Sequence, residues 1–135
     1  MNHARLLIDT SGLFRILQRE IRPIWEEHLA AGVIAVCPLV ELEFLYSARS
    51  LADRLDKIRL LRELFSWTPM TDNAFQRAAE VQQLLTQRAE HPSAGAIDLL
   101  IAATAERARL TVLADDNDFR TIARVTGQPV RSVIP

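Results

Sequence analysis

The chain has a single cysteine, Cys37, and only three histidines, His3, His28 and His91, in its 135 residues. One cysteine excludes an intrachain disulfide and a cysteine-based zinc site, and the three histidines lack the spacing of metal ligands. The N-terminus lacks the long apolar stretch of a secretory signal, and no apolar run approaches the length of a membrane span. We therefore expect a cytoplasmic protein with no membrane partner.

Lysine is scarce as well, since Lys57 is the only lysine among 16 basic residues. The net charge of −1 excludes a globally basic nucleic-acid binder but leaves room for a local basic patch. The planar fork of arginine suits phosphate oxygens, although a GC-rich genome that favours arginine codons explains the same bias. The length fits one domain, residues 1–135, and a hydrophobic content of 49% is enough to build its core.

Short apolar segments alternate with helical ones along the chain. Strands are expected at 5–8, 33–36, 111–114 and around Val130, with a short strand or turn at 66–69. Helices are expected over 12–20, 23–31, 39–49, 51–64, 71–89, 96–108 and 118–126, and a loop at 91–95. This alternation predicts an α/β fold, a small three-layer α/β/α sandwich with a mostly parallel central sheet and right-handed crossovers.

Carboxylates follow two of the expected strands. Asp9 comes directly after Leu6-Leu7-Ile8, and Asp115-Asp116-Asn117-Asp118 comes directly after the strand at 111–114. Two further places offer acids: Asp98 in the first turn of an Ala-rich helix, and Glu41 or Glu43 after the second strand. Taken singly, each acid can be a helix cap, a turn residue or a solvated side chain. Two strands that both end in carboxylates favour one shared acidic pocket, because ligands of open α/β sheets bind at those ends.

Such a pocket suits a hard divalent cation. Mg²⁺ and Mn²⁺ prefer carboxylate and water oxygens, whereas clustered carboxylates without a cation repel one another and take up protons. A bound ion activates water and polarises a phosphate, which together hydrolyse phosphodiesters. The hydroxyls of Thr10 and Ser11 are candidates for positioning that water or a substrate phosphate. A basic rim for RNA is expected from six arginines: Arg15, Arg19, Arg49, Arg54, Arg59 and Arg62.

Four segments in order resemble the motifs of PIN-domain ribonucleases. They are Leu7-Ile8-Asp9-Thr10-Ser11, Glu43-Phe44-Leu45-Tyr46-Ser47-Ala48-Arg49, Ala96-Ile97-Asp98-Leu99-Leu100-Ile101-Ala102-Ala103-Thr104-Ala105 and Val112-Leu113-Ala114-Asp115-Asp116-Asn117-Asp118-Phe119. The resemblance selects Glu43 rather than Glu41. It implies a site of Asp9, Glu43, Asp98, Asp116 and Asp118, with Asp9, Asp98 and Asp116 as metal ligands. Asp115 is an extra acid where the family usually has another residue, so the register of that loop could shift by one.

The small size and the segment Tyr46-Ser47-Ala48-Arg49 are most similar to VapC, the toxin of bacterial VapBC toxin–antitoxin pairs. This resemblance implies a PIN-like fold and an Mg²⁺- or Mn²⁺-dependent endoribonuclease that cleaves tRNA or rRNA. It also implies a homodimer that a VapB-like antitoxin inhibits.

Three other interpretations compete with a nuclease. A haloacid-dehalogenase phosphatase needs a second aspartate two residues after the first, where this chain has Ser11. A receiver domain needs a lysine at a late strand end, but Lys57 lies within an expected helix. A non-catalytic PIN-fold module could bind a protein partner through residues 39–46 and 51–64. The full set of acids argues against that module, because clustered carboxylates without a task only reduce stability.

Overall fold

Five parallel strands form one sheet in the computed structural model, which describes residues 3–89 and 94–135. The strands are β1 (Leu6–Ile8), β2 (Ile34–Val36), β3 (Ser66–Trp67), β4 (Thr111–Ala114) and β5 (Val130–Ser132). Their order is β3-β2-β1-β4-β5, and every neighbouring pair is parallel. The predicted α/β sandwich with a parallel central sheet is confirmed.

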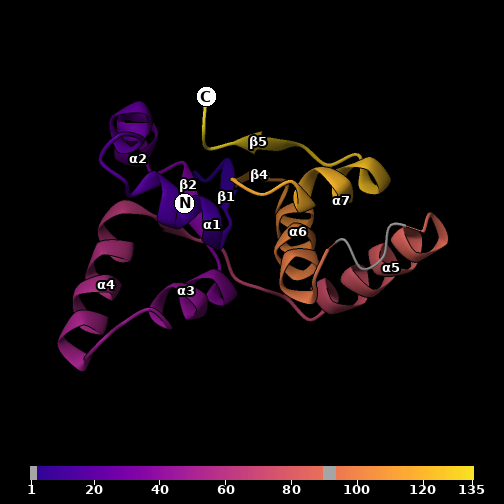
Figure 1. Ribbon diagram of the computed structural model, residues 1–135, viewed down its shortest axis with the longest axis horizontal. Helices are drawn as coiled ribbons and strands as arrows, with labels where there is room; N and C mark the ends of the chain where they lie inside the picture. Colours follow the sequence, from indigo (N-terminus) through magenta and orange to yellow (C-terminus); the bar gives the residue numbers. More distant parts are fainter. Residues whose placement is uncertain (1–2, 90–93) are drawn as a thin grey trace.

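Helices connect all the strands and flank the sheet. They are α1 (Thr10–Ile16), a 3-10 helix η1 (Arg22–Trp25), α2 (Glu26–Ala31), α3 (Pro38–Leu45), α4 (Leu51–Leu64), α5 (Asn73–Gln87), α6 (Ala96–Ala108) and α7 (Asp118–Thr126). Helices α1 to α4 gather on one side of the centre of the sheet and α5 to α7 on the other (Figure 1). No helix within the described residues combines the length and apolarity that a membrane span requires.

Several helix ends differ from the sequence-based expectation. The helix expected over 12–20 begins at Thr10, because the Asp9 side chain caps it, and it ends at Ile16. The helix expected over 39–49 ends at Leu45, after which the backbone N–H groups of Ser47 and Ala48 donate to the carbonyls three residues earlier. The segment 23–31 is divided into η1 and α2, and α5 is shorter at both ends than 71–89. The loop expected at 91–95 lies mostly outside the described residues.

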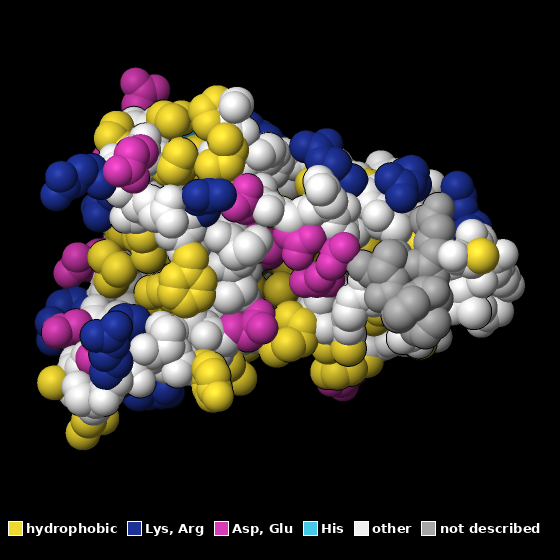
Figure 2. Space-filling view, in the orientation of Figure 1, with side chains coloured by type: hydrophobic (Ala, Val, Ile, Leu, Met, Phe, Trp, Pro, Cys, Tyr) yellow, Lys and Arg dark blue, Asp and Glu magenta, His cyan; other side chains and the backbone are white. Residues whose placement is uncertain are grey.

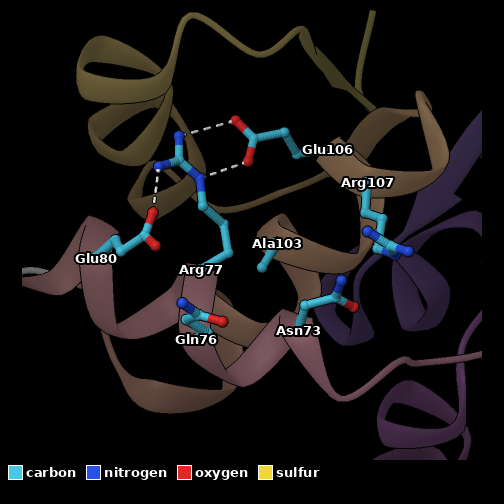
Figure 3. A pocket seen from close by; sticks show the side chains of 7 residues that line it. All are labelled: Asn73, Gln76, Arg77, Glu80, Ala103, Glu106 and Arg107. Carbon is cyan, nitrogen blue, oxygen red and sulfur yellow. Dashed lines mark hydrogen bonds and ion pairs between the residues drawn. The ribbon is translucent and has the colours of Figure 1, made fainter.

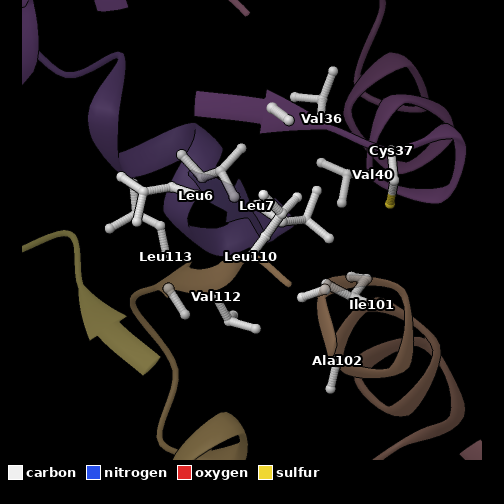
Figure 4. Packing of buried hydrophobic residues seen from close by; sticks show 14 of the residues in the cluster. Leu6, Leu7, Val36, Cys37, Val40, Ile101, Ala102, Leu110, Val112 and Leu113 are labelled. Carbon is white, nitrogen blue, oxygen red and sulfur yellow. The ribbon is translucent and has the colours of Figure 1, made fainter. Parts of the chain in front are cut away.

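The core lies on both faces of β1, β2 and β4. All residues of β1 and β2 are buried, as expected for central parallel strands covered by helices on both sides. Leu7 and Val112 of the sheet pack in the same cluster as Val40 of α3 and Ile101 of α6 (Figure 4). This packing fixes the carboxyl ends of the strands relative to α1, α3 and α6, which all carry candidate site residues.

Candidate metal centre

The acids lie at the point of the sheet where the strand order reverses, next to β1. The chain goes from β1 to β2 on one side, whereas β4 lies on the other side of β1, with Ile8 opposite Leu113. Asp9, just past β1, donates its backbone N–H to the carbonyl of Leu113 at 3.0 Å. The residues that follow β1 and β4 therefore emerge side by side, where open α/β sheets bind their ligands.

Asp9 is held rigidly in this place. Its carboxylate accepts hydrogen bonds from Ser11 Oγ at 2.7 Å and from the Gly12 N–H at 2.7 Å. The residue is only 3% exposed, and burial raises the pKa of its carboxyl despite these two hydrogen bonds. A Cβ at position 12 would lie 2.8 Å from Asp9 Oδ1 and 2.9 Å from the Leu113 carbonyl. Only glycine at position 12 lets the turn close on the Asp9 carboxylate.

Three further acids converge beside Asp9. Asp98 lies in the first turn of α6, Asp118 opens α7, and Asp116 accepts a hydrogen bond from the Asp118 N–H at 2.8 Å. Each offers a carboxylate oxygen, and these oxygens all lie within 4.8 Å of one another. We call Asp98, Asp116 and Asp118 the acidic cluster. Figure 2 shows acidic side chains gathered in the middle of this face of the molecule.

The clustered negative charges of these carboxylates favour the binding of a cation. Burial, followed by the charges of Asp116, Asp118 and Asp9 in that order, together raise the pKa of Asp98 to about 7. Like charges this close cannot all ionise at low cost. The donors are all carboxylate oxygens, the ligand type that Mg²⁺ and Mn²⁺ prefer. The residues present therefore fit a hard divalent ion, which the acidic cluster and Asp9 together would hold.

The two glutamates that the sequence left as alternatives have different surroundings. Glu43 accepts a hydrogen bond from Thr10 Oγ1, so it faces the turn that carries Asp9. Glu41 forms an ion pair with Arg62 of α4 at 2.9 Å. Of the two glutamates, Glu43 is the one that is hydrogen-bonded to the turn after β1. The hydroxyls of Thr10 and Ser11, which the sequence offers as candidates for positioning substrate, donate to the carboxylates of Glu43 and Asp9.

Three of the six arginines expected to form a basic rim take part in ion pairs. Arg15 pairs with Asp115 at 2.9 Å, Arg59 with Asp56 at 3.1 Å, and Arg62 with Glu41. The remaining members, Arg19, Arg49 and Arg54, are exposed.

Two arginines near the acids were not among the candidates that the sequence offered. Arg120 of α7 and Arg131 of β5 line a pocket of about 90 Å³ that Asp116 also lines. Arg131 lies near the acids because β5 pairs with β4, and the sequence alone does not predict that pairing.

A second pocket, of about 380 Å³, lies between α5 and α6. Arg77 dominates it and pairs with Glu106 at 2.7 Å and with Glu80 at 3.1 Å (Figure 3). These ion pairs involve Arg77, Glu80 and Glu106, three of the four charged side chains that line the pocket. Glu106 also lies in the last turns of α6, whereas Asp98 lies in its first turn. This pocket is therefore separate from the metal centre.

Comparison with known proteins agrees with this geometry. Residues 6–125 match the PIN domain family. Ribonuclease VapC21 of Mycobacterium tuberculosis is 35% identical over 130 residues, which cover 96% of this chain and 94% of that protein. Ribonuclease VapC2 of the same species is 37% identical over 131 residues, which cover 95% and 92%.

Solved structures share the fold at lower sequence identity. DNA-bound VapBC from Salmonella typhimurium has a TM-score of 0.77 at 17% identity, covering 96% of this chain and 98% of that chain. VapBC-5 from Mycobacterium tuberculosis has a TM-score of 0.60 at 24% identity, covering 96% and 97%. The family match and the full-length VapC ribonuclease relatives agree, and the chain belongs to the PIN domain family.

Proposed function

We propose that this protein is an Mg²⁺- or Mn²⁺-dependent endoribonuclease, the toxin of a VapBC-type toxin–antitoxin pair. The observation that carries the proposal is the acidic cluster, whose carboxylate oxygens lie within 4.8 Å of one another at the carboxyl ends of β1 and β4. The names of the relatives, Ribonuclease VapC21 and Ribonuclease VapC2, supply the substrate class. We place the protein in the cytoplasm, with tRNA or rRNA as its substrate.

Asp9, Asp98 and Asp116 are the proposed metal ligands, with Asp118 and Glu43 completing the site. When bound, the divalent ion supplies charge stabilisation for a phosphate and lowers the pKa of a water. The chain itself holds the acids in place: Ser11 and the Gly12 N–H orient Asp9, and Thr10 orients Glu43. The Asp116 carboxylate is oriented by the Asp118 N–H at 2.8 Å. These fixed orientations reduce the rearrangement that metal binding requires.

A cleavage assay with matched variants tests this proposal. Asp98→Asn and Asp116→Asn keep the size of each side chain but remove its charge, so we expect Mn²⁺-dependent cleavage of RNA to be lost. Glu41→Gln is the matched control, because Glu41 lies on α3 with Glu43 but pairs with Arg62. Cleavage at the wild-type rate by Asp98→Asn would exclude the metal-dependent mechanism. A wild type that cleaves no RNA in Mn²⁺ would instead favour the alternative of a non-catalytic PIN-fold module.

A VapB-like antitoxin is the proposed protein partner. Large apolar side chains are exposed on α3 and α4, including Leu42 at 62%, Tyr46 at 92% and Leu51 at 72%. Exposed apolar groups that gather on neighbouring helices are typical of a protein interface. The structural relatives from Salmonella typhimurium and Mycobacterium tuberculosis are VapBC assemblies, which supports this partner. Tyr46→Asp should prevent co-purification with the product of an adjacent antitoxin gene and leave RNA cleavage intact.

A homodimer is the proposed assembly of the toxin. Phe75 of α5 is 61% exposed, and it lines an apolar groove of about 290 Å³ together with Leu99 and Leu100 of α6. Asp98 directly precedes Leu99, so a second copy seated on this groove would lie close to the metal centre. Analytical ultracentrifugation should show a dimer for the wild type and a monomer for Phe75→Asp. A wild-type monomer at all concentrations would exclude this assembly.

A further inference from the structure

A small pocket lies next to the acidic cluster, at the carboxyl ends of β4 and β5. Its volume is about 90 Å³, and its polar lining consists of Asp115, Asp116, Asn117, Arg120, Arg131 and Ser132. That volume is about three times the share of one water molecule in the liquid. A space of this order suits a phosphate group, which has five heavy atoms.

The charges around this pocket favour an anion. Asp115 is already neutralised by Arg15, whose Nε lies 2.9 Å from Asp115 Oδ2. Asp116 belongs to the acidic cluster, where a divalent ion would offset its charge. Within the described part of the chain, neither Arg120 nor Arg131 forms an ion pair. Two arginines therefore remain with positive charge available to a ligand.

One of the two arginines is held in place before any ligand binds. The Arg131 guanidinium lies 4.6 Å from the centre of the Trp25 ring, in a cation–π contact. The ring is itself fixed, because Trp25 Nε1 donates to the Val133 carbonyl at 2.9 Å. Ser132 beside Arg131 accepts a hydrogen bond from the Ile134 N–H at 3.1 Å, which orients its hydroxyl. A phosphate bound here would meet donors that have already lost most of their side-chain freedom.

We propose that this pocket binds a backbone phosphate of the RNA next to the one that is cleaved. Arg120 and Arg131 supply the charge, and Asn117 and Ser132 supply hydrogen bonds. The pocket shares Asp116 with the metal centre, so the two phosphates would be neighbours along one strand. The inference rests on the proposed function. It assigns substrate positioning to residues outside the basic rim expected from the sequence.

Salt-dependent RNA binding tests this assignment. The probe is a fluorescently labelled, single-stranded RNA of twelve nucleotides, measured by anisotropy against the Asp98→Asn protein, so that no cleavage occurs. A protein that loses one phosphate contact on single-stranded RNA changes the slope of log K against log salt by about 0.7. Both arginines contact the same phosphate, so we expect the double variant to reduce the slope by about 0.7 and Arg120→Gln and Arg131→Gln each to reduce it by part of that amount. All three should also weaken binding.

Two further proteins complete the design. Arg120→Lys keeps the charge and should keep the slope. Arg107→Gln, which removes an arginine in the last turn of α6, should bind like the parent. Arg131→Gln loses the contact with Trp25, which can impair folding. Arg120 lies in the first turn of α7 and is exposed, so Arg120→Gln tests the phosphate subsite even in that case.

The outcomes separate the two proposals. If the parent binds RNA and both glutamine variants keep its affinity and slope, the phosphate subsite is excluded and the proposed function stands. If neither the parent nor the wild type binds RNA, the proposed function fails and the subsite fails with it.

Discussion

Asp98→Asn should make the metal-free protein more stable, although it removes a charged group from the proposed active site. Burial and the charges of Asp116, Asp118 and Asp9 raise the Asp98 pKa from 3.8 to about 7. The folded chain thus holds the Asp98 proton more tightly than the unfolded chain. The stability that this proton contributes is lost as the pH rises from about 4 to about 7, and the loss is complete above that range. Asparagine avoids the loss at every pH.

The size of the effect follows from the pKa difference. At 1.36 kcal/mol per pKa unit, the shift corresponds to roughly 4 kcal/mol. Asp98 is partly exposed, so solvent screening reduces this figure, and we expect about 1–2 kcal/mol. In a domain of this length that amounts to an increase in Tm of about 3–8 °C at pH 8. The amide of asparagine can still donate to Asp118, as the protonated carboxyl does.

Thermal unfolding in EDTA measures the stability of the metal-free protein, and thermal unfolding in Mn²⁺ measures the effect of metal binding. In EDTA, Asp98→Asn should exceed the wild type in Tm at pH 8, and the gap should narrow as the pH falls toward 4. In Mn²⁺ at pH 8, the wild type should gain stability and Asp98→Asn should gain much less. Asp72→Asn, at an exposed N-cap without a side-chain hydrogen bond, is the control and should match the wild type throughout. An Asp98→Asn protein that is less stable in EDTA at pH 8 would refute the claim of repulsion in the acidic cluster.

The remaining predictions concern packing and local geometry. Gly12→Ala should lower the free energy of unfolding by about 1–3 kcal/mol, because its Cβ meets Asp9 and the Leu113 carbonyl. Gly95→Ala, where a Cβ meets nothing within 4 Å, should change it by less than about 1 kcal/mol in the same urea titration, because the loss of a preferred N-cap residue opposes the reduced freedom of the unfolded chain. Phe119→Ala should cost about 3–5 kcal/mol in urea, because the ring is 1% exposed; a loss under 1 kcal/mol would contradict the packing. Asp115→Asn should cost less than about 1 kcal/mol, since the ion pair with Arg15 is solvated; a larger loss in a double-mutant cycle would show a stronger coupling.

The parts of the fold that depend on local sequence were predictable. An apolar run that stops at an aspartate, as at Ile8-Asp9 and Ala114-Asp115, marks the end of a buried strand, and both ends occur as expected. Helices α4, α6 and α7 have the expected bounds. The helix ends that differed depend on hydrogen bonds, such as the Asp9 cap, that periodicity does not contain.

Contacts between distant segments were the harder part of the site. Thr10 and Glu43 are 33 residues apart, and Arg15 and Asp115 are 100 apart, so neither contact leaves a local pattern. The choice of Glu43 over Glu41 came from the family resemblance, since both glutamates lie in the same helix. The pocket of Arg120 and Arg131 depends on β5 lying beside β4, which follows only from the completed sheet.

The central claim is that carboxylates from separate segments of the chain surround one divalent ion. Anomalous diffraction at the manganese edge, from crystals grown with Mn²⁺, tests it most directly. We predict a peak within coordination distance of the Asp9, Asp98 and Asp116 carboxylates, with Asp118 beside it. Crystals that take up Mn²⁺ only at other surfaces, with the acidic cluster empty, would contradict the claim.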